Sequence, residues 1–162
     1  MNTIEVKKIK PNKSVSKYLK DLFSDEDWSV FSGGYGYDKN DLVIIDTNSE
    51  FSGVELESRF IQARSYAELK NHGIKERHYK SVRLQKLNQQ LIFTENKPID
   101  ILEYKIIATP FDVVEVTKEI FFKNIPFRNP KIMEYIIDML EDASVTYITK
   151  GYFDISNFYG KL

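Results

Sequence analysis

The stretch SGGYGYDKNDLVIID, residues 32–46, places three glycines in front of an apolar run. The residues that follow the glycines decide between a phosphate-binding loop and a hairpin turn. A phosphate-binding loop is followed at once by a helix, whose N-terminus and backbone N–H groups face the anion. Here the β-rich run LVII follows the glycines, and the β-rich run WSVF precedes them. The pattern therefore predicts two strands joined in a hairpin, with Gly33, Gly34 or Gly36 at positive φ and an exposed tip.

Two segments further along the chain carry the signals of a helix. Ser52 and Glu55 have the spacing of a capping box, and Gly73 stands where a C-terminal cap belongs. Asn129 and Pro130 are the expected N-cap and first residue of a second helix, which runs to residue 143. The expected buried stripe of this second helix consists of Ile132, Met133, Ile136, Ile137 and Leu140.

Shorter patterns predict the other elements. Residues 80–95 fit either the alternation of strands or the spacing of a helix, and we predict two strands there. The segments 97–108 and 111–122 are rich in Ile, Val and Phe, and we expect two long neighbouring strands separated at Pro110. A strand over residues 3–9, a helix over 14–23 and a last strand over 144–149 complete the expected elements.

The elements indicate the fold class, because strands outnumber helices and do not alternate with them strictly. The chain has 162 residues, of which 42% are hydrophobic, and it contains no repeat or linker-like segment. A chain of this length buries roughly 70% of its unfolded surface. We therefore predict one globular domain, residues 1–162, of the α+β class, with a largely antiparallel mixed sheet and about three helices packed on it.

Composition removes several classes of function. The chain has no cysteine and two histidines, so a metal site would have to use carboxylates, and we expect no cofactor. The N-terminus is charged and lacks the apolar region of a signal peptide, and no run approaches the 18 apolar residues of a membrane span. We expect a soluble cytoplasmic protein without a membrane partner.

Acidic residues are distributed unevenly. Residues 21–57 contain ten acidic residues and one basic residue, and in the predicted last helix Glu134, Asp138 and Glu141 recur at i, i+4 and i+7 with Asp142 beside them. Like charges at this spacing repel by a few tenths of a kcal/mol, and acids in the last turn oppose the helix dipole. Breaking two local rules at one place indicates either a solvated face or a surface kept for a partner.

These features favour a non-enzymatic protein-binding domain with an acidic and aromatic surface. A small inhibitor or immunity-type protein that neutralises a basic toxin or nuclease would present such a surface to its basic protein partner. The tyrosines of the glycine loop add amphipathic contact area. The expected partner-binding residues are Asp25, Glu26, Asp27, Tyr35, Tyr37, Asp38, Asp41, Glu134, Asp138, Glu141 and Asp142.

An enzyme is the first alternative. Glu103 and Lys105 form a Glu-x-Lys pattern on a predicted strand, and with Asp46 they would give the carboxylate and lysine site of a Mg²⁺-dependent nuclease. Alternation on a half-exposed strand explains the same pattern. Glu55 and Glu57 form another acid pair, but both fall in the first turn of a predicted helix, where carboxylates complement the dipole.

A nucleic-acid-binding adaptor is the second alternative. The basic strip, residues 70–86, carries six basic residues and one acid, although the whole chain has a pI near 6.2. We therefore rank a nucleic-acid partner below a protein partner. His72 and His78 lack a further ligand at metal-binding spacing and are treated as ordinary. The adaptor would use Lys75, Arg77, Lys80 and Arg83.

Overall fold

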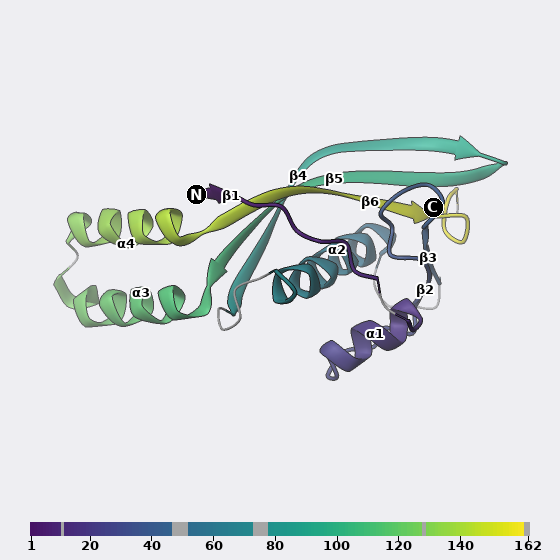
Figure 1. Cartoon of the computed structure of the whole chain (residues 1–162). Helices are drawn as coiled ribbons and strands as arrows, with labels where there is room; N and C mark the ends of the chain where they lie inside the picture. Colours follow the sequence, from purple (N-terminus) through teal and green to yellow (C-terminus); the bar gives the residue numbers. More distant parts are fainter. Residues whose placement is uncertain (11, 47–51, 73–77, 128, 161–162) are drawn as a thin grey trace.

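A computed structural model describes residues 1–10, 12–46, 52–72, 78–127 and 129–160. In these ranges the chain forms one six-stranded mixed sheet in the order β2-β3-β6-β5-β4, with β1 paired to β6, and four α-helices (Figure 1). The elements are β1 (Asn2–Thr3), α1 (Val15–Leu22), β2 (Phe31–Gly33), β3 (Val43–Ile45), α2 (Gly53–Lys70), β4 (Tyr79–Thr94), β5 (Lys97–Pro110), α3 (Phe111–Asn124), the 3-10 helix η1 (Ile125–Phe127), α4 (Pro130–Ala143) and β6 (Val145–Asp154).

The long strands β4, β5 and β6 form an antiparallel meander, and β3 joins β6 in parallel. The short strands β2 and β3 pair antiparallel, as the glycine stretch predicts. This arrangement confirms the predicted α+β single domain with a largely antiparallel mixed sheet. The described part of the chain has four α-helices where about three were expected.

Helix α2 covers one face of the sheet (Figure 1). Strand β5 shows why, because its side chains alternate: Leu102, Tyr104 and Ile106 are buried, whereas Glu103 and Lys105 are half-buried on the opposite face. The inward row of β5 therefore supplies the core, and the outward row leaves the second face of the sheet open.

Aromatic rings join α2 to the strands beneath it. Phe60 on α2 packs against Phe31 on β2 and Phe153 on β6, with ring centroids 5.2 Å and 5.9 Å apart. All three rings are fully buried. Burying each phenylalanine contributes roughly 1.5–3 kcal/mol, so this stack fixes α2 over the β2–β3–β6 side of the sheet.

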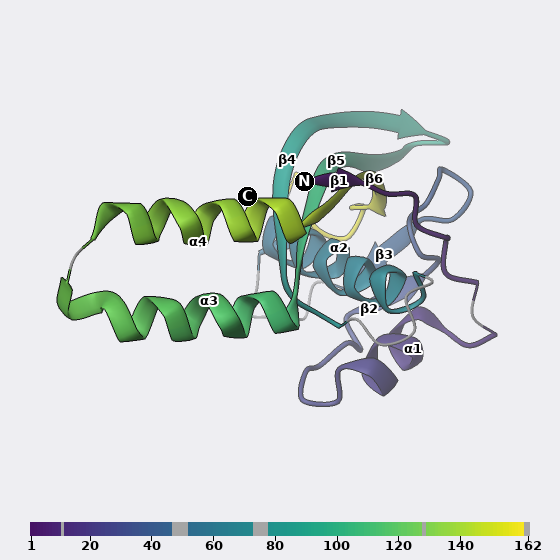
Figure 2. The same cartoon turned by 60° about the vertical axis from the view of Figure 1, so that its left-hand side comes forward.

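Helices α3 and α4 form a hairpin that projects from the sheet between β5 and β6 (Figures 1 and 2). We call residues 111–143 the arm and the rest of the fold the body. The Thr109 and Ser144 hydroxyls lie 2.8 Å apart at the base, where the chain leaves β5 and returns to β6. This buried contact closes the base of the arm.

The prediction of a strand over residues 111–122 is wrong, because this segment forms α3. Pro110 ends β5, and the helix begins at the next residue. The β-branched residues of the segment have high strand propensity, but its charges are spaced for a helix. Glu115 pairs with Lys118 at 3.4 Å, and Glu119 pairs with Lys123 at 3.9 Å.

The prediction of two strands over residues 80–95 is also wrong, because β4 is one continuous strand. A two-residue turn with Glu95 and Asn96 at positive φ, 52° and 64°, connects β4 to β5. A bulge after Lys86 shifts the register of β4 against β5. The bulge interrupts the alternation of the sequence, so a single strand looks like two.

The cap signals located the helices correctly. Ser52 and Glu55 make the predicted capping box of α2, and the Asn129 side chain caps α4. The predicted helix over 14–23 forms as α1. The strand expected over residues 3–9 is wrong beyond Thr3, because β1 covers only Asn2–Thr3. Gly73, the expected C-cap of α2, lies outside the described residues.

Candidate functional site

The arm has almost no core of its own. Among its described residues only Thr117 and Ile136 are buried. Met133 and Ile137 were expected in the buried stripe of α4, but both are exposed. Only one face of α4 packs on α3, and these two side chains lie outside it. The arm contains nine exposed large hydrophobic residues, which is more than half of those in the described chain: Phe111, Val116, Phe121, Phe122, Ile125, Phe127, Met133, Tyr135 and Ile137.

A pocket of about 450 Å³ lies near the tip of the arm. Its apolar lining includes Phe121 and Ile125 from one side of the tip and Ile132 and Met133 from the other. The side chain of Asn129, which also lines the pocket, already accepts a hydrogen bond from the Lys131 N–H. The pocket therefore offers mainly apolar surface and suits an apolar side chain of another molecule.

Acidic side chains border this apolar surface on α4. Glu134, Asp138, Glu141 and Asp142 are all exposed, on the side of the helix away from buried Ile136. Ile137 lies three residues after Glu134 and four before Glu141, so the exposed apolar strip and the acids are neighbours on the helix surface. The two features that mark interaction surfaces, uncovered apolar area and one sign of charge, therefore coincide here.

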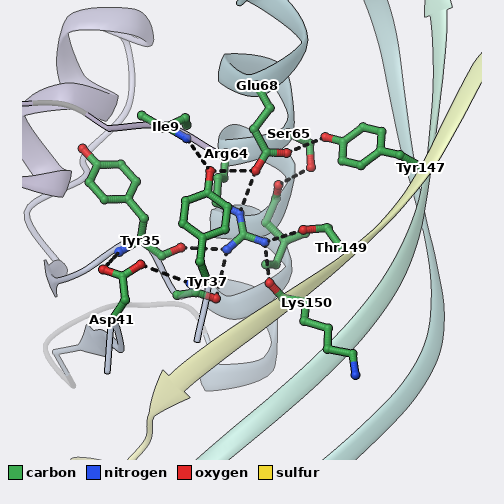
Figure 3. Close-up of polar contacts among 12 residues, drawn as sticks. Ile9, Tyr35, Tyr37, Asp41, Arg64, Ser65, Glu68, Tyr147, Thr149 and Lys150 are labelled. Carbon is green, nitrogen blue, oxygen red and sulfur yellow. Dashed lines mark hydrogen bonds and ion pairs between the residues drawn. The ribbon is translucent and has the colours of Figure 1, made fainter. Parts of the chain in front are cut away.

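The glycine loop closes on the carboxylate of Asp41. This carboxylate accepts hydrogen bonds from the backbone N–H groups of Tyr35 and Tyr37 at 3.1 Å and 3.2 Å (Figure 3). A Cβ on Gly34 would stand 2.0 Å from Asp41 Oδ1, and Gly36 has a φ of +72°. The glycines are therefore required for a tight loop, and the positive φ of Gly33 and Gly36 agrees with the hairpin prediction. The exposed tip comprises residues 38–40, whereas Tyr35 and Gly36 are buried.

Arg64 on α2 is the centre of a buried polar network beneath this loop (Figure 3). Its guanidinium donates to the carbonyl oxygens of Tyr35 and Gly36 at 2.7 Å and 3.1 Å. The same group donates to Thr149 Oγ1 at 2.8 Å and to the Lys150 carbonyl at 2.6 Å. One side chain thus joins α2, the glycine loop and β6.

Glu68 balances the charge of Arg64 from one helical turn away. The two groups form an ion pair at 3.4 Å, and the hydroxyls of Tyr37 and Tyr147 donate to the Glu68 carboxylate at 2.8 Å and 2.7 Å (Figure 3). Burial, and next the Glu68 charge, raise the pKa of both tyrosines above the ordinary value. These groups stay protonated and serve as hydrogen-bond donors, so the network is structural.

Unlike the acids of α4, most of the loop residues that were predicted to bind a partner are not exposed. Tyr35 is buried and Tyr37 is half-buried, so neither offers its ring as a free contact surface. Asp41 is occupied by the loop backbone, and Asp38 lies exposed at the tip, where it accepts from the Asn40 N–H at 2.8 Å. Of the loop residues predicted to bind a partner, Asp38 is the one that the structure exposes.

The acids of residues 25–27 are exposed but lie beside α1, and the structure does not bring them together with the acids of α4 (Figure 1). Glu26 accepts two hydrogen bonds from Arg59, at 2.9 Å and 2.7 Å. Asp27 accepts from the Ser29 N–H at 2.9 Å, and Ser29 lowers the pKa of this carboxyl. Two of the three acids therefore have partners within the chain.

Asp46, Glu103 and Lys105 do not converge. Glu103 and Lys105 lie on the open face of β5, where Glu103 pairs with Lys150 at 3.5 Å. Asp46 follows β3, which is separated from β5 by β6. Glu103 lies opposite Lys150 of β6, and continuing the parallel β3–β6 register places Asp46 at the level of residue 156. The two acids are therefore six residues apart along the strand direction, which corresponds to roughly 20 Å. The predicted carboxylate and lysine site is therefore not assembled by these residues.

The basic strip is only partly visible, because Lys75 and Arg77 lie outside the described residues. Lys80 binds Glu115 of α3 at 2.5 Å and lies 4.7 Å from the ring centre of Phe111. Lys80 is thus engaged at the base of the arm. Arg83 is exposed on β4.

A buried pair of acids, Glu57 and Asp100, was not among the predicted site residues. Glu57 was assigned to the first turn of α2 as a dipole partner, yet its side chain points into the body and is 1% exposed. Asp100 on β5 is 5% exposed. The alternation of β5 contained a signal for Asp100, because this residue shares the inward row with Leu102 and Ile106.

Comparisons with known protein families, curated protein sequences and solved structures gave no match to the chain. Within the described residues, no helix combines the length and the apolar character needed to cross a bilayer.

Proposed function

We propose that the protein is a non-enzymatic binding protein that uses the arm to dock onto a basic protein partner. The observation that carries this proposal is the uncovered apolar surface of the arm. Phe122 is 66% exposed and Phe127 is 74% exposed, on helices that bury only Thr117 and Ile136 among their described residues. Large apolar side chains gathered on one projecting element are typical of a surface that another protein covers.

Charge defines the chemistry of the partner. The α4 segment 130–143 carries four acidic residues and one basic residue, and all four acids are exposed. A matching partner presents lysines or arginines around an apolar side chain that enters the tip pocket. Opposite charges accelerate association and reject acidic competitors, while the apolar contact supplies most of the affinity. A small inhibitor or immunity-type protein that neutralises a basic toxin works in this way.

The experiment compares three chains, the wild type, an arm variant and a body control, in capture from the source cell. Phe122→Ser with Phe127→Ser removes the two most exposed rings of the arm. Ile148→Ser is the control, because Ile148 on β6 is 63% exposed but lies on the body. We expect the wild-type chain and the control to retain the same basic protein and the arm variant to lose it.

The captured protein is then purified and titrated against each chain by calorimetry. A loss of affinity of at least tenfold in the arm variant alone supports the proposal, and the affinity of the wild-type chain should fall as salt rises. Equal binding by all three chains contradicts it. Concentration-dependent dimerisation of the purified wild-type chain, abolished in the arm variant, would instead assign the arm to self-association.

A further inference from the structure

Glu57 and Asp100 form a buried acid pair between α2 and β5. Three of their four carboxylate oxygens, Glu57 Oε1, Glu57 Oε2 and Asp100 Oδ1, have no hydrogen-bond partner. Burial, and next the Asp100 charge, raise the pKa of Glu57 to about 8, so the two groups act on each other. A carboxylate without partners in the interior costs about 1–3 kcal/mol or more, so the fold maintains an unfavourable pair at this place.

The bulge in β4 brings two further polar side chains to the same face. Lys86 pairs with Tyr104 and Gln89 pairs with Leu102, and both of these β5 partners belong to the inward row. Without the bulge, residues three apart on a strand would point to opposite faces. The bulge therefore aligns Lys86 and Gln89 with the acid pair.

Gln89 connects the pair to the exposed edge of the sheet. Its amide donates to Asp100 Oδ2 at 2.6 Å and its oxygen accepts from Lys86 Nζ. Lys86 and Gln89 are exposed. Burial raises the pKa of both Glu57 and Asp100, and the Lys86 charge offsets part of this rise. The acid pair is thus buried behind two flexible surface side chains, which can move aside to admit a small ion.

We propose that Glu57 and Asp100 bind one hard divalent cation, Mg²⁺ or Mn²⁺, at the edge of the sheet beside Lys86. The unpartnered donors are carboxylate oxygens, which suit hard cations rather than zinc or copper. The described residues contain no group of three or more His, Cys, Asp or Glu side chains placed to hold a metal. Two carboxylates are sufficient for Mg²⁺, which keeps several of its waters when it binds a protein.

A bound cation relieves the unfavourable burial of two neighbouring acids without hydrogen-bond partners. It supplies a partner for the three free oxygens and compensates the two negative charges together. A structural role for the acids is the competing explanation, in which a proton held between them neutralises one charge. The two explanations differ in one measurable respect, because only the first makes stability depend on the cation concentration.

The test measures thermal unfolding in a titration with MnCl₂ and with MgCl₂, against KCl at equal ionic strength. We expect the midpoint of the wild-type chain to rise by roughly 5–10 °C at a cation concentration about 100 times the Kd. Glu57→Gln and Asp100→Asn should abolish the rise. Glu103→Gln, on the same strand but the opposite face, should keep it.

Both site variants should fold without added cation, because each replaces a buried carboxyl with a neutral amide of nearly the same shape. Electron paramagnetic resonance of added Mn²⁺ provides a second readout and should show one bound ion per wild-type chain and none in Glu57→Gln. The proposal is overturned if neither cation raises the wild-type midpoint above the KCl control. It is equally overturned if the rise persists in both site variants, since the ion would then bind elsewhere.

Discussion

The body and the arm use the same kinds of residue for opposite purposes. In the body, Phe60 and Phe153 are fully buried and pack on each other, whereas in the arm Phe122 and Phe127 face the solvent. The body also satisfies the charge of Arg64 with four hydrogen bonds and an ion pair. One region therefore holds the fold, and the exposed side chains of the other contribute little to stability.

The largest effect is expected in the body, at Arg64. Arg64→Met keeps most of the side-chain volume but leaves Glu68 buried without its cation and the loop carbonyls without their donor. We expect the free energy of unfolding to fall by about 3–5 kcal/mol, measured by urea denaturation. Arg83→Met, at an exposed position on β4, should change it by less than about 0.5 kcal/mol. A small loss at Arg64 would show that other contacts hold the loop on α2.

An identical truncation in each region gives a direct comparison. Ile61 on α2 and Ile136 on α4 are both buried, but Ile61 belongs to the main hydrophobic core and Ile136 does not. We expect Ile61→Ala to cost about 4 kcal/mol and Ile136→Ala about 2 kcal/mol, because a cavity in a thin hairpin collapses more easily. Equal losses, measured by the same denaturation, would mean that the arm is as well packed as the body.

The smallest effect, and one of opposite sign, is expected from the acids of the arm. Asp138→Asn with Glu141→Gln relieves repulsion along α4 and improves the fit to the helix dipole, so the free chain should gain about 0.5 kcal/mol of stability. Association with the captured partner should slow, most clearly at low salt. The matched variant Asp25→Asn with Asp38→Asn changes the same number of charges on the body. A loss of stability, or an unchanged association rate, would remove the acids of α4 from the binding surface.

Local signals in the sequence predicted part of the body and one helix of the arm. Capping residues located α2 and α4, because a cap is defined by a few neighbouring side chains, and the glycines located the β2–β3 hairpin. The α3 segment was assigned to a strand because its Val, Ile and Phe residues favour strands, while the decisive charge pairs at helical spacing are weak individually.

The candidate sites were harder to predict because they depend on distant contacts. The exposure of Glu134, Asp138, Glu141 and Asp142 followed from the helical period. The exposure of the apolar residues of the arm did not, since it reflects the absence of a covering element rather than any local pattern. The pairing of Glu57 with Asp100 joins a helix to a strand that lies more than 40 residues away, and no spacing along the chain reports it.

The register of β5 and β6 indicates that the arm can be replaced without changing the sheet. Ala108 lies opposite Val145, so the strands that enter and leave the arm are hydrogen-bonded neighbours about 5 Å apart. In topological terms the whole arm is an insertion at the end of a β-hairpin, and a two-residue turn such as Asn-Gly can bridge the same gap. The arm can therefore be exchanged: a different helical hairpin grafted at this junction should leave the sheet and α2 to fold as before, and under the proposed binding role it would change the partner.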